Sequence, residues 1–125
     1  MLQAFDHVNV KTSRLEEMVA WYADVLGMHA GSRPDFGFPG AWLYLGDQAL
    51  VHLVGTSAEP QSIEPRIEHF ALRATGLAGF LERLKENGVE YRLADVPGFG
   101  ILQVNIHDPD GNHIHIDFDA GEPRS

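Results

Sequence analysis

Histidine is the residue type in this sequence whose spacing points most clearly to chemistry. His7 and His52 are 45 residues apart, and His69 and His115 are 46 residues apart. Neutral imidazole is a good ligand for Zn, Ni, Fe, Co or Cu and a poor one for Mg or Ca. Two histidine pairs with matching separations therefore indicate a transition-metal site.

Each of these histidines lies in a segment where polar and apolar residues alternate. In residues 113–118, for example, His113, His115 and Asp117 alternate with Ile and Phe. Successive side chains of a strand point to opposite faces, so each imidazole faces away from the apolar side that a helix would cover. A single histidine of this kind is more often an ordinary surface or hydrogen-bonded side chain. Four histidines at matched positions favour a metal site instead.

The two pairs belong to an internal repeat. His7 and His69 are 62 residues apart, and Leu15 and Leu77 are separated by the same distance. A duplicated strand–helix–strand–strand–strand unit explains these offsets. We therefore expect an α+β fold of two βαβββ modules that form a curved mixed sheet, a cup with its helices on the outside. The expected parts are module one at about 1–56, a linker at about 57–65, module two at about 66–119 and a mobile tail at 120–125.

Turn signals and apolar spacing predict the elements that position these residues. A capping box at residues 13–16 and Gly27 bound the first helix, whereas Thr75 and residues 87–88 bound the second. Asp-Pro-Asp-Gly-Asn at 108–112 predicts a tight turn before the last strand. The predicted strands are 5–10, 28–31, 41–45 and 49–54 in module one and 67–72, 89–93, 102–106 and 113–118 in module two, with loops at 33–40 and 95–100.

Composition narrows the class of protein. The 125 residues suit one domain, and a formal net charge of −9 argues against a nucleic-acid partner. The absence of Cys excludes disulfides and thiolate metal sites and fits a cytoplasmic protein. The N-terminus lacks the pattern of a signal peptide, and no segment has the length of apolar residues that a membrane span needs. We expect a cytoplasmic protein with a small-molecule partner.

Three motifs resemble those of the vicinal oxygen chelate superfamily, which includes glyoxalase I, extradiol dioxygenases, and bleomycin- and fosfomycin-resistance proteins. They are Trp-Tyr-Ala-Asp-Val-Leu-Gly-Met at 21–28, Glu-His-Phe-Ala-Leu at 68–72 and Asp-Pro-Asp-Gly-Asn at 108–112. The resemblance implies paired βαβββ modules around an open cup. It also implies a metal ion in the cup, a substrate that chelates the ion through two oxygens, and a homodimer. The cup lies either within one chain or between two.

The resemblance assigns the metal ligands to His7, His52, His69 and His115. It implies one divalent ion, namely Zn, Ni, Fe, Co or Mn. Glyoxalases usually have Glu at the two last-strand positions, which are His52 and His115 here. Four neutral imidazoles leave the charge of the ion uncompensated and remove the carboxylate that glyoxalases use as a base. The catalytic residue therefore stays unassigned.

A second group of residues is predicted to bind substrate. Amides would orient it, and a cationic or aromatic side chain would hold an anionic or flat group. A solvated sheet face, turn chemistry or a core position explains the same residues without a substrate. His113 either lines the pocket or supports a ligand from behind. The candidates are Asn9, Arg33, Phe36, Trp42, Gln103, Asn105 and His113.

The sequence thus supports a metal-dependent enzyme, with glyoxalase-like lyase or isomerase chemistry ahead of extradiol-type ring cleavage. A non-catalytic protein that binds a small molecule, as bleomycin-resistance proteins do, is the alternative from another class. A closed four-histidine zinc site with a purely structural role is also open.

Overall fold

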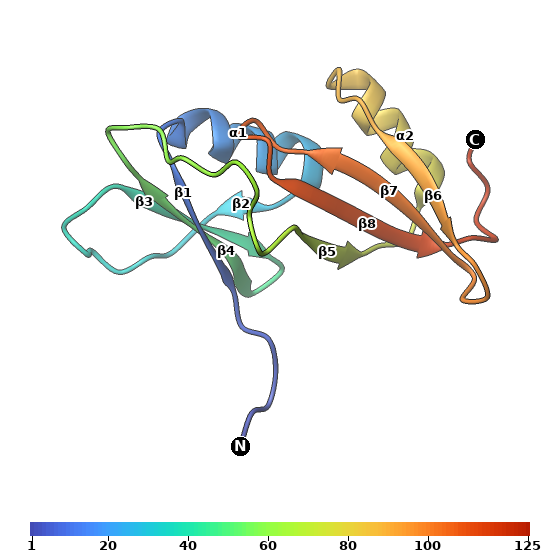
Figure 1. Ribbon diagram of the computed structural model, residues 1–125, viewed down its shortest axis with the longest axis horizontal. Helices are drawn as coiled ribbons and strands as arrows, with labels where there is room; N and C mark the ends of the chain where they lie inside the picture. The colour runs from blue at the N-terminus through green and yellow to red at the C-terminus, as the bar shows by residue number, and fades with distance from the viewer. The chain divides into compact units, whose positions relative to one another are not determined.

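The computed structural model describes residues 1–125, which form two compact units, Met1–Ile63 and Glu64–Ser125 (Figure 1). Each unit is a four-stranded sheet with one helix, in the order strand, helix and three strands. The first unit contains β1 (Val8–Thr12), α1 (Leu15–Leu26), β2 (His29–Ala30), β3 (Gly40–Leu45) and β4 (Gln48–Gly55). The second contains β5 (His69–Arg73), α2 (Leu77–Glu86), β6 (Arg92–Val96), β7 (Ile101–His107) and β8 (His113–Asp119). The predicted βαβββ modules are confirmed.

The two sheets have the same topology. Their strand orders are β1-β4-β3-β2 and β5-β8-β7-β6. In each unit the first and last strands are parallel neighbours, and the other neighbours are antiparallel. This pairing places residues that are 43 or 44 positions apart side by side: Asn9 of β1 is aligned with His52, and His69 of β5 is aligned with His113.

The predicted apolar faces form the core of each unit. Helix α1 buries Met18, Tyr22 and Val25, and α2 buries Leu77, Leu81 and Leu84. In the second sheet, alternate residues of β7 and β8 are at most 3% exposed; they are Leu102, Val104, Ile106, Ile114, Ile116 and Phe118. Gly27 ends α1 at φ 69°, a left-handed conformation that suits glycine.

The two predicted N-cap residues are wrong, each by one position. The N-cap of α1 is Arg14, not Ser13, and no side chain caps this end, although Thr12 Oγ1 accepts a bond from the Arg14 backbone N–H. The N-cap of α2 is Gly76 at φ 87°, not Thr75. The cap of α2 comes from the C-terminal segment instead, since Glu122 Oε1 accepts from the backbone N–H groups of Gly76 and Leu77 at 2.8 and 3.1 Å.

Five of the eight predicted strands match the structure to within one residue at each end, and three differ by more. β1 begins at Val8 and β5 at His69, so His7 lies just before its strand and His69 lies at the first position of its own. β6 spans Arg92–Val96 rather than 89–93, because the Val89 N–H still bonds the carbonyl of Leu84 at the end of α2. The predicted loop at 95–100 is therefore a shorter turn.

Neither helix is long and apolar enough to cross a membrane.

The contact of Glu122 with α2 predicts a stability effect. Glu122→Ala leaves two helix N–H groups without their acceptor, so we expect a loss of about 1 kcal/mol in the free energy of unfolding. Urea titration would measure it. Glu90→Ala, which removes an exposed carboxylate from the same unit, is the control and should change little. Equal stability of the two variants would show that the contact contributes nothing.

Candidate metal centre

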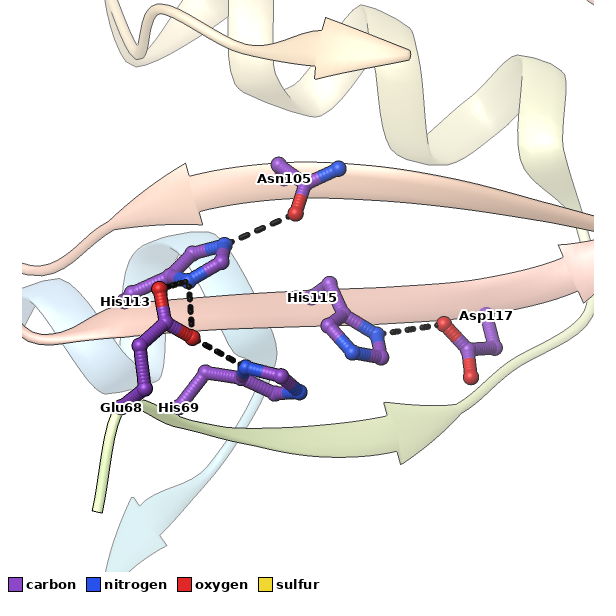
Figure 2. A network of polar contacts seen from close by, with 6 residues as sticks. All are labelled: Glu68, His69, Asn105, His113, His115 and Asp117. Carbon is purple, nitrogen blue, oxygen red and sulfur yellow. Dashed lines mark hydrogen bonds and ion pairs between the residues drawn. The ribbon is translucent and has the colours of Figure 1, made fainter. Parts of the chain in front are cut away.

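In the second unit, three histidines gather on the face of the sheet opposite the core (Figure 2). The parallel pairing of β5 with β8 aligns His69 with His113, and His115 follows two residues along β8. The ring centroid of His69 lies 4.4 Å from that of His115 and 5.1 Å from that of His113. The structure therefore brings the predicted ligands His69 and His115 together and adds His113 beside them.

Glu68 connects two of these rings. Its carboxylate accepts from Nδ1 of His69 and lies 2.9 Å from Nδ1 of His113. The other ring nitrogen of His113, Nε2, lies 2.7 Å from Oδ1 of Asn105. Hydrogen bonds from His69 and His113 lower the pKa of the Glu68 carboxyl below its usual value, so this side chain is ionised at neutral pH.

His115 has a carboxylate partner of its own. Its Nδ1 lies 2.6 Å from Oδ1 of Asp117, two residues further along the same face of β8. The side chain of His115 is 9% exposed and that of Asp117 is 26% exposed. This pair is the most buried contact between an imidazole and a carboxylate in the chain.

In the first unit, His7 and His52 stack on each other. Their ring centroids are 3.7 Å apart and their planes differ by 8°. β4 lies between β1 and β3, and the ring of Trp42 on β3 stacks on His52 at 4.1 Å. Burial, followed by repulsion from His7, lowers the pKa of His52, which favours the neutral imidazole that binds metals.

Each of the four predicted ligands keeps one ring nitrogen without a protein partner. His7, His69 and His115 bond a carboxylate through Nδ1, the partner of His7 being Asp6 at 2.7 Å, and their Nε2 atoms remain. His52 differs, because its Nε2 donates to the carbonyl of Ala49 at 3.0 Å and Nδ1 remains. Histidine ligands of metals typically bond a carboxylate or carbonyl through the second nitrogen. The free nitrogens of each histidine pair therefore suit a transition-metal ion.

A second donor set overlaps the first. The carboxylate of Glu68 and ring nitrogens of His69 and His113 all lie within 4.8 Å of one another. Sequence reasoning assigned no role to Glu68 or Asp117. The signal for Asp117 was its position on the same strand face as His115, and Glu68 was part of a recognised motif without a function of its own.

The predicted substrate residues fall into two groups. In the first unit, the Arg33 guanidinium lies 5.0 Å from the Phe36 ring centre and donates to the carbonyl of Phe38, and Phe36 lies 6.2 Å from Trp42. Asn9 is exposed beside His52. In the second unit, Gln103 and Asn105 pair across the sheet with Asp117 and His115, respectively. Their roles toward a substrate stay predictions.

Comparison with known proteins places the chain in a family. The family model of the Glyoxalase/Bleomycin resistance protein/Dioxygenase superfamily matches residues 4–116. "Glyoxylase I 4" of Arabidopsis thaliana is 31% identical over 92% of this chain and 70% of its own length. "Biphenyl-2,3-diol 1,2-dioxygenase 2" of Rhodococcus globerulus is 30% identical over 92% of this chain, which spans 62% of that protein.

A solved structure supports the same fold. The chain aligns with a glyoxylase/bleomycin resistance protein/dioxygenase domain from Frankia sp. EAN1pec with a TM-score of 0.78, over 98% of this chain and 96% of that one, at 16% identity. At this identity the likeness concerns the fold alone. Together with the duplicated topology, the match over residues 4–116 shows that this chain belongs to the Glyoxalase/Bleomycin resistance protein/Dioxygenase superfamily.

Proposed function

We propose that this protein is a divalent-metal-dependent enzyme that acts on a small substrate with two vicinal oxygens, by glyoxalase-like lyase or isomerase chemistry. The observation that carries the proposal is the set of four histidines at duplicated positions, each with one ring nitrogen free of protein partners. Membership of the superfamily and 31% identity to the plant protein named "Glyoxylase I 4" support it.

The proposed ligands are His7, His52, His69 and His115, and the proposed ion is Zn, Ni, Fe, Co or Mn. Such an ion polarises bound oxygens and stabilises the negative charge that develops on them. An octahedral ion with four protein ligands keeps two positions for a bidentate substrate. A homodimer and a cytoplasmic location remain predictions.

The chain's own side chains supply binding around that ion. Phe36 is about half exposed and its ring lies beside that of Trp42, so the pair offers an apolar surface for a flat group. The Arg33 guanidinium beside it is the cation for an anionic group. In the second unit, the amides of Gln103 and Asn105 would orient substrate oxygens. The base that would move a proton stays unassigned.

Ring-cleaving dioxygenase chemistry is the second candidate function. The donor set of Glu68, His69 and His113 has the two-histidine, one-carboxylate composition that suits non-haem iron in oxygenases. The 30% identity to a protein named biphenyl-2,3-diol 1,2-dioxygenase points in the same direction. A protein that binds a small molecule without chemistry is the third candidate, and retention of ligand after metal removal would distinguish it.

Metal analysis tests the proposed ligands. Protein purified without a His-tag should contain about one transition-metal ion per chain. His52→Ala and His115→Ala should each lose it, because both histidine pairs are proposed to serve one ion. The control is His29→Ala, which removes an exposed histidine outside both pairs and should retain the ion. Absence of metal after reconstitution with each of the five ions would contradict the proposal.

Activity assays separate the two reactions. The protein loaded with Ni, Co or Zn should convert the hemithioacetal of methylglyoxal and glutathione, and His115→Ala should reduce kcat/KM at least about 100-fold. The competing assay uses the Fe- or Mn-loaded protein with a catechol and O₂. Turnover of the catechol without turnover of the hemithioacetal would replace the lyase proposal with the dioxygenase one.

The lowered pKa of His52 predicts a pH effect in the metal-free protein. Below the ordinary value of 6.5, the unfolded chain binds a proton at this position more readily than the folded chain does. The stability that His52 contributes is therefore present above pH 6.5 and lost as the pH falls through 6.5 toward the lowered pKa. The free energy of unfolding should thus decrease as the pH is lowered from about 7.5 to about 5.5. In His52→Gln, this decrease should be smaller.

His29→Gln provides the matched control, because His29 is exposed. It should show the same pH dependence as the unmodified protein. If His52→Gln also follows that dependence, burial of His52 contributes nothing to it.

A further inference from the structure

Carboxylates stand behind the proposed ligands of the second unit. Asp117 lies 2.6 Å from Nδ1 of His115, and Glu68 accepts from Nδ1 of His69. An ionised carboxylate only accepts hydrogen bonds. Each contact therefore requires a proton on Nδ1, and in the neutral ring this leaves the lone pair on Nε2. A metal binds that lone pair.

We propose that Asp117 and Glu68 are positioning residues, which hold His115 and His69 in the tautomer and ring orientation that present Nε2 to the metal. The proposal rests on the proposed metal site. It assigns a function to two carboxylates that the ligand set itself does not contain. The two carboxylates also supply negative charge next to the imidazoles, which a site of four neutral ligands otherwise lacks.

Burial ranks the two contacts. Asp117 and His115 have side chains that are 26% and 9% exposed, whereas Glu68 and His69 are 66% and 41% exposed. Water competes more strongly for an exposed carboxylate, so its hold on the ring is weaker. Asp117 should therefore have the larger effect.

The same contacts exclude His113 from the proposed ligand set. Its Nδ1 faces Glu68 and its Nε2 faces Oδ1 of Asn105, so neither nitrogen is left for a metal. His113 instead connects Glu68 to Asn105 and holds the carboxylate in place (Figure 2). The Glu68–His69–His113 group is, on this proposal, a support for His69 rather than a second metal site.

Imidazole ¹⁵N spectra of the metal-free protein provide the first test. At about pH 8, where unperturbed imidazoles are neutral, His115 should be in the Nδ1–H tautomer. Asp117→Ala should shift His115 toward the Nε2–H tautomer, which unconstrained histidine side chains favour. Asp95→Ala removes an exposed carboxylate from β6 of the same sheet and should leave the tautomer unchanged. An unchanged tautomer in Asp117→Ala would overturn the proposal.

Titration with Zn²⁺ provides the second test. Asp117→Ala should weaken binding about 10- to 100-fold and Glu68→Ala less, whereas Asp95→Ala should bind as the unmodified protein does. Asp117→Glu keeps the carboxylate, so it should restore part of the Nδ1–H tautomer and part of the Zn²⁺ affinity. This variant serves as the test if Asp117→Ala folds poorly. His113→Ala should weaken binding less than His115→Ala; loss of Zn²⁺ to the same extent would make His113 a ligand and overturn its assignment.

The two tests separate this proposal from the proposed function. An unmodified protein that binds none of the five proposed ions would contradict the metal-dependent enzyme. The tautomer of His115 is measured without metal, and its response to Asp117→Ala would still decide whether Asp117 positions the ring.

Discussion

The parallel pairing of the first and last strands in each unit is the constraint on which the rest of the site depends. Parallel neighbours cannot be joined by a tight turn, so a helix and two further strands fill the connection. His7 and His52 stack only because β1 lies beside β4, and Glu68 reaches His113 only because β5 lies beside β8. One topological feature, used twice, thus produces both clusters.

The histidine clusters are accompanied by carboxylates that contact their rings. The proposed set of four imidazole ligands brings no negative charge, whereas Asp6 and Asp117 each contact one ring and Glu68 contacts two. At the proposed site, these carboxylates would offset part of the charge of an ion and leave its coordination positions to nitrogen. In the proposed site, these acidic groups would lie one contact away from the ion, behind the imidazoles.

The repeat and the alternation of apolar residues were sufficient to predict two modules, their core faces and the histidine pairs. The alternation is visible within short windows of sequence, and the histidine separations occur twice, so both can be read directly. The Glu122 cap could not be read in this way, because it is a single contact between residues 46 positions apart that no repeated pattern marks. The roles of Glu68 and Asp117 were also missed, because they depend on which ring nitrogen meets which oxygen. The predicted start of β6 was wrong because the backbone N–H of Val89 bonds the carbonyl of Leu84 at the end of α2.

The stacking of Trp42 on His52 gives the first unit an optical property. An indole stacked on an imidazole loses fluorescence when that imidazole gains a proton, because the protonated ring accepts the excited electron. Trp42 lies 4.1 Å from His52, centre to centre, whereas Trp21 lies on α1 beside Tyr22. The emission of Trp42 is therefore a built-in reporter of the protonation of His52, readable in solution without a label.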